Sequence, residues 1–511
     1  MAKIVLITIC EKGALGVRYI SSLLQKEGYG TAIVYFKEYN QIKKKEVKGV
    51  INNYKGIKQI WHEGIMHDGE EMIFAYPPEV TVKELALLCD IIREQNPILV
   101  GISLASSYFP IADQITAAIK KEFQIPVLWG GAGPTMNPEQ MIQSCDILAI
   151  GEAEYAIREL VKKIEAGQTY SEISNLWVKS KGEITKNPTN PLILELDALP
   201  FPDFSFENKF LITNNTLIRN CKEINNFPGM YTIMTARGCP FSCSFCINDY
   251  YRKLYKGEKY VRRRSVSNVI EELILAMRNL NINYVTFYDE VFTFDKKWIK
   301  EFSSAYVEKI KLPFWCNIYP TMVDEEIISW LKDAGVESVT LGIQSGSERL
   351  VKESYTREAP NAKILRAANL LHKYKIKYYV DIITESPFET EEDCQKTLDL
   401  LLKLPRPFTI STLSKLSLFE NLFVTILAKK EKQVLSKDIF DYYNRLYLLT
   451  TFNYIPKYFI KIMAEKKCFK NDPRRLNLFF SFHKAYTSLK DLCKNLLPHN
   501  FWVKIKKAIY V

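Results

Sequence analysis

Short apolar runs alternate with stretches of helical spacing through the first third of the chain. Five of these runs predict buried strands, at residues 4–9, 31–36, 97–102, 126–129 and 147–150. Helical spacing occupies residues 112–122 and residues 13–27, and Gly28 is the predicted C-cap of the second of these helices. Strands separated by helices of this length predict a doubly wound, Rossmann-like α/β domain over residues 1–165.

A second alternation of strands and helices runs from about residue 229 to about residue 430. The predicted strands are residues 231–235, 284–288, 314–318, 338–343 and 377–383, and the predicted helices are 269–280, 325–334 and 362–374. Polar residues follow several of these strands, as Asp289 and Glu290 follow the second. Repeated units of this kind predict a barrel, or part of one, with its site at the C-terminal strand ends.

Two further segments differ from these patterns. Residues 166–228 contain closely spaced prolines, which predict an extended, semi-rigid linker; they include Pro188, Pro191, Pro200 and Pro202. Residues 431–511 have few β-branched alternations and predict a mostly α-helical C-terminal domain.

The composition is that of an ordinary soluble globular protein, with 47% hydrophobic and 25% charged residues among 511. Apart from one trio, the 11 cysteines are scattered and form no dense framework. This usage favours a reducing cytoplasm over a disulfide scaffold. No run approaches eighteen uninterrupted apolar residues, and the apolar N-terminal run is too short for an anchor. We therefore expect no transmembrane helix.

Positive charge is concentrated at the C-terminal end. The net charge is +11, and residues 429–511 contain 18 Lys and Arg against 6 Asp and Glu, so the rest of the chain is nearly neutral. Aromatic residues alternate with these basic residues, among them Tyr442, Tyr447, Tyr458 and Trp502. A helical cap with a solvated basic face explains this pattern. So does peripheral contact with an anionic membrane surface or a phosphorylated lipid.

The most specific motif is a trio of cysteines. Cys239, Cys243 and Cys246 have C-x3-C-x2-C spacing with no fourth cysteine nearby, and Gly238 and Pro240 favour a loop there. A structural zinc ion needs four ligands, so a zinc knuckle would have to recruit one from elsewhere. Three thiolates on a four-iron cluster leave one iron open for chemistry. The spacing therefore favours an iron–sulfur cluster over zinc.

This loop resembles the cluster loop of the radical S-adenosylmethionine (SAM) superfamily. The resemblance implies a [4Fe-4S] cluster on the three cysteines, SAM on the open iron, and a partial (β/α)6 TIM barrel over residues 229–430. It places Phe245 beside the adenine. It places Asp289 and Glu290 where acidic groups accept hydrogen bonds from the SAM ammonium, although one of them could instead cap the following turn. The other positions that it assigns to SAM are Gln344, Ser345, Ser347, Ile382 and Ile383.

Small residues follow three predicted strands of the first domain. They include Gly101, Gly130 with Gly131, and Gly151, and they leave space for a large ligand against the sheet. The glycines alone would also suit a plain nucleotide-binding domain. Their order resembles the cobalamin-binding domain found in front of many radical SAM enzymes. That resemblance implies cobalamin-binding positions at Leu15, Gly16, Ser103, Gly130, Gly131, Thr135, Gly151 and Glu152.

The chain departs from some cobalamin-binding domains in the segment after the first strand, where those domains carry a histidine that ligates cobalt. Residues 10–16 contain no histidine that could ligate cobalt from below. Most radical SAM relatives of this type also lack it, so the resemblance implies cobalt without a histidine beneath it. A domain re-purposed for another use is the alternative.

The two resemblances together cover residues 1–430 and imply an activity. Cleavage of SAM gives a 5′-deoxyadenosyl radical that abstracts hydrogen from an unactivated carbon, and cobalamin nearby would supply a methyl group. We expect methylation of a small molecule or a lipid precursor. The alternatives are cyclisation or rearrangement without methyl transfer, and a non-catalytic cobalamin or cluster sensor.

The resemblance also implies a one-electron reductant such as flavodoxin or ferredoxin. No motif indicates nucleic acid, and we expect none as a partner. We expect a cytoplasmic protein, with peripheral contact at the inner membrane face as a further hypothesis.

Overall fold

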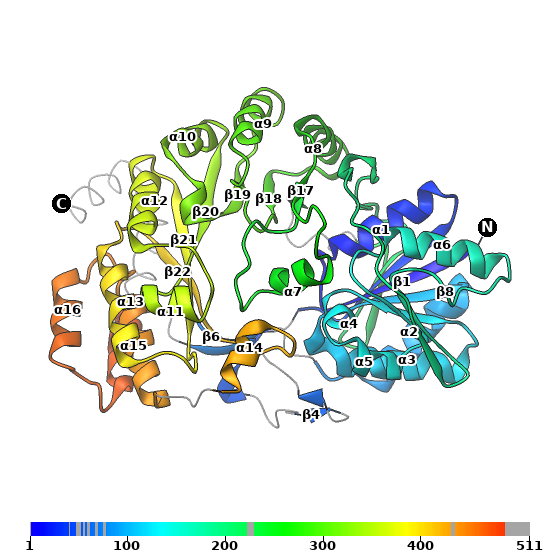
Figure 1. The fold of residues 1–511 in the computed structure, drawn as a ribbon, viewed down its shortest axis with the longest axis horizontal. Coiled ribbons are helices and arrows are strands. Elements are labelled where there is room, and N and C mark those ends of the chain that lie inside the picture. Colours follow the sequence, from blue (N-terminus) through cyan, green and yellow to red (C-terminus); the bar gives the residue numbers. More distant parts are fainter. Residues whose placement is uncertain are drawn as a thin grey trace.

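The computed structural model describes residues 2–39, 41–46, 53–54, 57–58, 62–66, 70–74, 78–221, 229–430 and 435–485. Its ribbon forms two lobes, with most of the N-terminal strands and helices in one and the later segments in the other (Figure 1). In the described part of the chain, each lobe is built on a sheet of nine strands.

Parallel strands form the centre of the first sheet, in the order β10-β9-β8-β1-β2. They are β1 (Lys3–Ile9), β2 (Gly30–Phe36), β8 (Leu99–Ser103), β9 (Val127–Gly130) and β10 (Ile147–Ala149). The helices of this lobe are α1 (Leu15–Lys26), α2 (Val82–Gln95), α3 (Phe109–Glu122), α4 (Ala132–Met136), α5 (Pro138–Met141) and α6 (Glu154–Glu165). The strands are almost wholly buried, as parallel strands covered on both faces must be. The predicted doubly wound fold is confirmed.

Residues 166–228 are more regular than the predicted linker. They contribute β11 (Leu176–Ser180), β12 (Glu183–Lys186), β13 (Lys209–Thr213) and β14 (Thr216–Arg219), which widen the first sheet at both edges. Along β11 the buried Leu176 and Val178 alternate with more exposed residues, which is the pattern of an antiparallel strand with one face in the core and one toward solvent. The prolines lie between these strands, where no ladder hydrogen bond is lost.

The second sheet contains the predicted partial barrel. Among the described residues, six parallel strands follow one another in sequence order. They are β15 (Met230–Ile233), β18 (Tyr284–Phe287), β19 (Phe314–Ile318), β20 (Val336–Gln344), β21 (Lys377–Thr384) and β22 (Thr409–Lys415). The helices between them are α7 (Ile247–Leu254), α8 (Val266–Leu280), α9 (Lys296–Lys309), α10 (Glu325–Asp333), α11 (Glu348–Glu353), α12 (Asn361–Lys373) and α13 (Glu391–Lys403).

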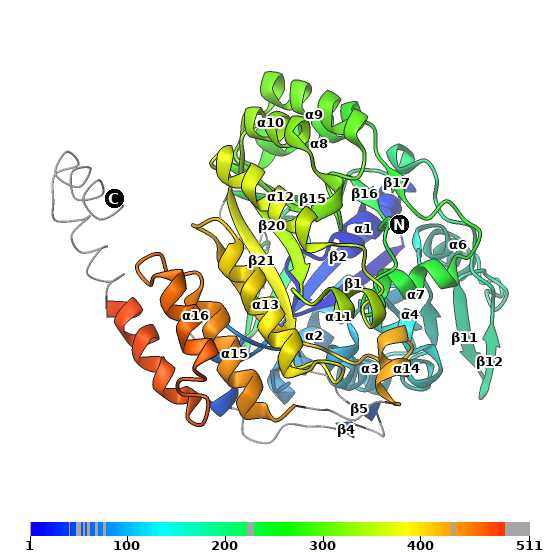
Figure 2. The ribbon, with the colours of Figure 1, turned by 60° about the vertical axis from the view of Figure 1, so that its left-hand side comes forward.

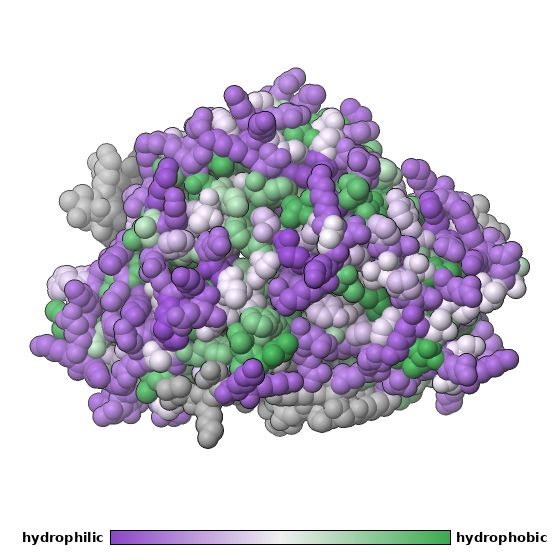
Figure 3. Space-filling view, viewed as in Figure 1, coloured by the Kyte–Doolittle hydropathy of each residue, from purple (hydrophilic) through white to green (hydrophobic). Residues whose placement is uncertain are grey.

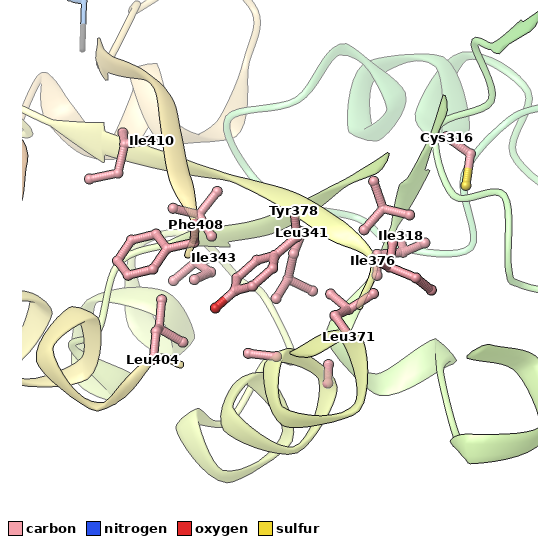
Figure 4. Packing of buried hydrophobic residues seen from close by; sticks show 14 of the residues in the cluster. Cys316, Ile318, Leu341, Ile343, Leu371, Ile376, Tyr378, Leu404, Phe408 and Ile410 are labelled. Atoms are coloured by element: carbon pink, nitrogen blue, oxygen red, sulfur yellow. The ribbon is translucent and has the colours of Figure 1, made fainter. Parts of the chain in front are cut away.

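The barrel strands and their outer helices share one apolar core. Leu341 and Ile343, two residues apart on β20, lie on the same face of the sheet as Tyr378 of β21 (Figure 4). Leu371 of α12 packs against this face, and Leu404 after α13 belongs to the same buried cluster. Because successive side chains of a strand face opposite sides of the sheet, one set faces this core and the other set faces the barrel interior.

One segment of the predicted first domain belongs to the second sheet. The strands β6 (His62–Ile65), β7 (Glu71–Phe74) and β3 (Ile42–Lys43) extend that sheet, with β6 antiparallel to β22. A Cβ on Gly64 would lie 2.8 Å from the Leu413 carbonyl oxygen, so glycine permits this close pairing. The short strands β4 (Asn53–Tyr54) and β5 (Ile57–Lys58) pair with each other. The domain predicted as residues 1–165 is thus interrupted.

The C-terminal segment is helical where it is described. It contains α15 (Lys437–Leu449), α16 (Lys457–Glu465) and a helix over residues 477–485, and α14 (Phe423–Ala428) precedes it after β22. Figure 2 shows α15 and α16 beside α13, at the side of the barrel. Tyr442 and Tyr447, whose side chains the sequence pattern assigned to a basic surface, are buried in the barrel core instead. No helix in the described residues is long and apolar enough to cross a bilayer.

Candidate active site

A cavity of about 380 Å³ lies between the two lobes. One wall is the C-terminal edge of the first sheet, where β8, β9 and β10 end. The other wall comes from the loop after β15, from α7 and from the end of β18. Doubly wound sheets and barrels both bind their ligands at the C-terminal ends of their strands. The cavity therefore lies where each of the two folds places its ligand.

The first lobe provides a floor of small residues. Seven of the eight residues predicted for cobalamin line the cavity, namely Leu15, Gly16, Ser103, Gly130, Gly131, Gly151 and Glu152. A Cβ built on Gly16 would meet nothing within 4 Å, so this residue borders open space. A floor of small residues with apolar neighbours fits a large, flat ligand such as part of a cobalamin.

Thr135 is the predicted cobalamin residue that does not line the cavity. It is fully buried, and its hydroxyl donates to the Gly131 carbonyl at 2.8 Å and accepts from the Gly151 amide at 3.0 Å. The structure therefore gives Thr135 a supporting position, in which it joins the two glycine turns that form the floor.

Glu152 borders the cavity, but its carboxylate is bound by the other lobe. Arg262 of β17 (Arg262–Arg263) donates to both carboxylate oxygens, at 2.8 and 2.9 Å. Arg237 of β16 (Ala236–Arg237) lies 3.3 Å from Glu152 and 2.6 Å from Glu154. Burial raises the pKa of Glu152, but the hydrogen bond with Arg262 and the charge of Arg237 outweigh burial and lower it. The sequence assigned Glu152 to cobalamin; in the structure its carboxylate clamps the two lobes together.

The three cysteines lie on the loop between β16 and α7. Cys243 is buried, and Cys239 and Cys246 are partly exposed. Gly238 has a φ of 85°, and a Cβ there would lie 2.4 Å from the Tyr260 carbonyl oxygen, so only glycine lets the backbone pass. The Cys246 amide donates to the Cys243 carbonyl at 2.9 Å. Backbone contacts therefore determine the shape of this loop.

The thiols share one electrostatic environment. Burial raises the pKa of Cys239 to about 12 and that of Cys246 to about 11, and the charges of Glu290 and the neighbouring cysteines add to the shift. The Arg357 guanidinium, which lies over the Tyr319 ring, donates to the Cys243 sulfur at 3.7 Å. Thiols of this kind exchange their protons for bound metal cations. Three such thiols, one of them beside a cation, fit the ligand set of an iron–sulfur cluster.

The described residues add no support to the zinc alternative. In the part of the chain that the structure describes, no group of three or more His, Cys, Asp or Glu side chains is arranged to hold a single metal ion. A zinc knuckle would require four such ligands around one ion.

Asp289 and Glu290 follow β18 and have different surroundings. Asp289 is buried, and one of its oxygens accepts hydrogen bonds from the amide and the hydroxyl of Thr235, both at 3.0 Å. Asp289 therefore fixes the end of the strand that leads into the cysteine loop. This structural role is similar to the turn cap that the sequence offered as an alternative to SAM binding. Glu290 lines the cavity and remains accessible there, and desolvation by the surrounding protein raises its pKa. Of the two predicted acceptors, only Glu290 borders the cavity.

The residues predicted after β20 divide in a similar way. Ser345 and Ser347 are buried and contact α13, Ser345 through the Thr397 hydroxyl and Ser347 through the Asp393 carboxylate. Ser347 also caps α11. Their hydroxyls therefore shape this turn. Gln344 has a φ of 69°, and its amide lies beside Gly342, next to the guanidinium of Arg357.

Of the three apolar residues predicted beside adenine, two lie together and the third lies in a different cluster. Phe245 packs against a buried cluster that contains Ile383, Tyr355 and, from the first lobe, Met136. Ile382 lies on the opposite face of β21 and packs in the core with the outer helices. Phe245 and Ile383 therefore lie together, whereas Ile382, which was also predicted for adenine, faces the core under the outer helices.

Sequence reasoning missed the side chains that reach the site from other elements. Arg237 and Arg262 form the clamp, Arg357 contacts Cys243, and Tyr288 is 60% exposed at the cavity. The Tyr255 hydroxyl accepts a hydrogen bond from the Glu152 amide at 2.9 Å. Arg237 stands two residues before the first cysteine, and this position beside the motif was the one available signal.

Two known protein families match the chain, one in each of the two lobes that form the cavity. The model of the radical SAM superfamily matches residues 233–401, from the end of β15 into α13. The model of the B12 binding domain matches residues 69–161, which include β8, β9 and β10.

Related proteins match this chain over about two thirds of its length. An uncharacterized methyltransferase of Pyrococcus horikoshii is 27% identical over 333 residues, which are 64% of this chain and 69% of that protein. An anaerobic magnesium-protoporphyrin IX monomethyl ester cyclase of Cereibacter sphaeroides is 24% identical over 61% of this chain, and the match spans half of the cyclase.

A solved structure shares the fold. It is the radical SAM methyltransferase TsrM from Kitasatospora setae with cobalamin and a [4Fe-4S] cluster bound. Its TM-score is 0.59 at 16% identity, over 80% of this chain and 72% of that one. The two matched family models and the three-cysteine loop beside a glycine-rich cavity identify the chain as a radical SAM enzyme with a B12 binding domain, and its implied cofactors are a [4Fe-4S] cluster, SAM and cobalamin.

Proposed function

We propose that this enzyme methylates an unactivated carbon of a small molecule or a lipid precursor. The observation that carries the proposal is one continuous cavity, lined by the glycine-rich strand ends and by Gly238 and Ile247, the residues on either side of the three cysteines. A methyl group held in the first lobe and a carbon radical formed at the barrel would meet in this space. The resemblance to a protein named as a methyltransferase supports the same reaction.

The proposed roles follow from the geometry. When bound, the cluster and SAM supply a 5′-deoxyadenosyl radical, and cobalamin supplies the methyl group. Cys239, Cys243 and Cys246 hold the cluster, and Glu290 accepts hydrogen bonds from the SAM ammonium. The apolar side chains of the cavity exclude water from the reacting carbon.

Cyclisation without methyl transfer is the second candidate. A specific observation favours it, because one relative of this chain is named as a cyclase. The cofactor positions are the same for both reactions, so the residues described above serve either one.

A labelled methyl group separates the two candidates. The reconstituted enzyme is incubated anaerobically with a reductant, a metabolite and lipid extract, and SAM that carries a trideuterated methyl group. We expect a product that contains the label together with 5′-deoxyadenosine. A product without the label, formed with 5′-deoxyadenosine, would contradict methylation and favour cyclisation or rearrangement.

We also propose peripheral membrane contact through the C-terminal helices, which would suit a lipid precursor. Tyr458 and Ile462 stand four residues apart on α16 and are exposed, and Leu478 and Phe482 repeat this spacing on the next helix. Residues 457–485 contain eight Lys and Arg against two Asp and Glu. An apolar stripe among basic residues suits an anionic lipid surface.

Co-sedimentation with vesicles of phosphatidylglycerol and phosphatidylcholine tests this contact. We expect binding to the anionic vesicles, and its loss in the variant Ile462→Ser with Leu478→Ser. Equal binding of this variant and the native enzyme would exclude these helices as the membrane contact.

A further inference from the structure

An exposed apolar face lies beside the cysteine loop. On α14, Phe423 is 37% exposed and Ile426 is 50% exposed, and their spacing of three places them on the same side of the helix. Lys429 and Lys430 follow directly and are exposed. Figure 3 shows a hydrophobic patch at the place that α14 occupies in Figure 1, with hydrophilic residues around it.

A lysine from α7 completes this face. The Lys253 ammonium lies 5.3 Å from the centre of the Phe423 ring and 2.5 Å from an Asp249 carboxylate oxygen. Lys253 is exposed, whereas Asp249 is buried. Glu420 is an exposed acidic residue just before α14. We call Lys253, Phe423, Ile426, Lys429 and Lys430 together the α14 face; basic groups outnumber acidic ones around its apolar centre.

The α14 face is joined directly to the loop that carries the cysteines. The Val424 amide, next to Phe423, donates to the carbonyl of Ser244 at 3.1 Å, and Ser244 adjoins Cys243 in the chain. The helix that carries Lys253 begins at the residue after Cys246. Other residues of the same loop, such as Gly238, line the cavity. The loop therefore has one side toward the reaction and the α14 face on another.

We propose that the α14 face docks an acidic flavoprotein of the flavodoxin type that reduces the cluster. In each encounter the partner gives up one electron, passing from the flavin hydroquinone to the semiquinone, and the cluster takes up that electron. An apolar centre with a charged rim is the usual composition of a protein interface. Lysines at the rim complement an acidic partner and speed its approach. Electron-transfer encounters are weak and use small interfaces, so a face of one short helix and one lysine is sufficient.

The test compares two reductants and two matched variants. The first variant is Ile426→Ser with Lys430→Glu, on the α14 face. The control is Val307→Ser with Lys309→Glu, which changes an exposed aliphatic residue and an exposed lysine on α9, another helix of the barrel. Both holoenzymes are supplied with SAM, and 5′-deoxyadenosine is measured with a purified acidic flavodoxin, reduced to the hydroquinone, or with dithionite.

We expect the α14-face variant to need at least tenfold more flavodoxin for half-maximal SAM cleavage, while its rate with dithionite equals that of the native enzyme. The control variant should match the native enzyme with both reductants. A second readout does not depend on turnover, because the Kd of oxidised flavodoxin for the holoenzyme, measured by titration, should rise by a similar factor. Added salt should weaken the binding of flavodoxin to the native enzyme and so reduce the difference in Kd between the native enzyme and the α14-face variant.

Three results would overturn the docking assignment. The first is an unchanged flavodoxin dependence and Kd in the α14-face variant. The second is an equal loss with dithionite, which would mean that the face supports the loop and does not bind a partner. The third is a native dimer that this variant dissociates, which would assign the face to a second copy of the chain. None of these results depends on whether methylation or cyclisation follows SAM cleavage, so the docking assignment and the proposed function fail separately.

Discussion

Replacement of Arg262 by methionine should separate the two lobes at the cavity. Arg262 is almost fully buried and makes two hydrogen bonds to Glu152, whose side chain is 18% exposed. Removal of one partner from a fully buried ion pair costs about 3–5 kcal/mol. Because Glu152 is partly hydrated and keeps Arg237 at 3.3 Å, we expect a smaller loss, about 1–3 kcal/mol in the free energy of unfolding.

The assay is denaturation by urea followed by circular dichroism, together with cobalamin titration of the purified enzyme. The matched control is Arg93→Met. That arginine also contacts two carboxylates, those of Asp90 and Glu122, but it is 57% exposed, so its loss should cost less than about 1 kcal/mol. We expect Arg262→Met to bind cobalamin more weakly, because the lobe that carries the glycine floor is less firmly docked.

A double-mutant cycle with Glu152→Gln measures the pair itself. The coupling energy should be about 1–3 kcal/mol, since the two side chains are in direct contact. If Arg262→Met is no more destabilising than Arg93→Met and binds cobalamin as the native enzyme does, the clamp contributes nothing and the reasoning is refuted.

Three further predictions concern single residues. Gly238→Ala should lower the iron bound after reconstitution at least several-fold, because its Cβ would overlap the Tyr260 carbonyl at a φ of 85°; normal iron content would show that the loop can shift. Glu290→Gln should raise the Kd of SAM about tenfold, since it removes the charge that attracts the ammonium, while iron content stays unchanged; an unaltered Kd would remove Glu290 from the SAM site. Burial raises the pKa of Glu389 to about 8 from 4.5, so the folded protein holds a proton that the unfolded chain releases, and stability falls as the pH rises from about 5 to 8. Glu389→Gln should therefore be more stable than the native enzyme by about 2–4 kcal/mol at pH 8 and nearly equal to it at pH 5 in urea denaturation; an equal difference at both values would contradict this titration.

The local elements of both sheets were predictable from hydrophobic spacing. Residues 314–318 were predicted as a strand and form β19, and most other predicted strands differ from the observed ones by one or two residues. The crossover of β6 to β22 was not predictable, because its register depends on a partner about 350 residues away in the chain. A short strand carries no sequence signal for such a distant neighbour.

The candidate site shows the same limit at the level of side chains. A motif indicates which residues stand near a ligand, but it does not say which of two neighbours turns toward it. Asp289 and Glu290 are adjacent, yet only Glu290 lines the cavity. The partners of Glu152 lie in the other lobe, at Arg237 and Arg262, and only the packing of the lobes brings them together.

The most direct test of the central claim is anaerobic reconstitution of the full chain with iron, sulfide and cobalamin, followed by a SAM cleavage assay. We predict one [4Fe-4S] cluster and one cobalamin per chain, and 5′-deoxyadenosine formed under reducing conditions. The Cys243→Ala variant should retain cobalamin and lose both the cluster and SAM cleavage. A native enzyme that binds zinc in place of iron, or that forms no 5′-deoxyadenosine with a full cluster, would contradict the account.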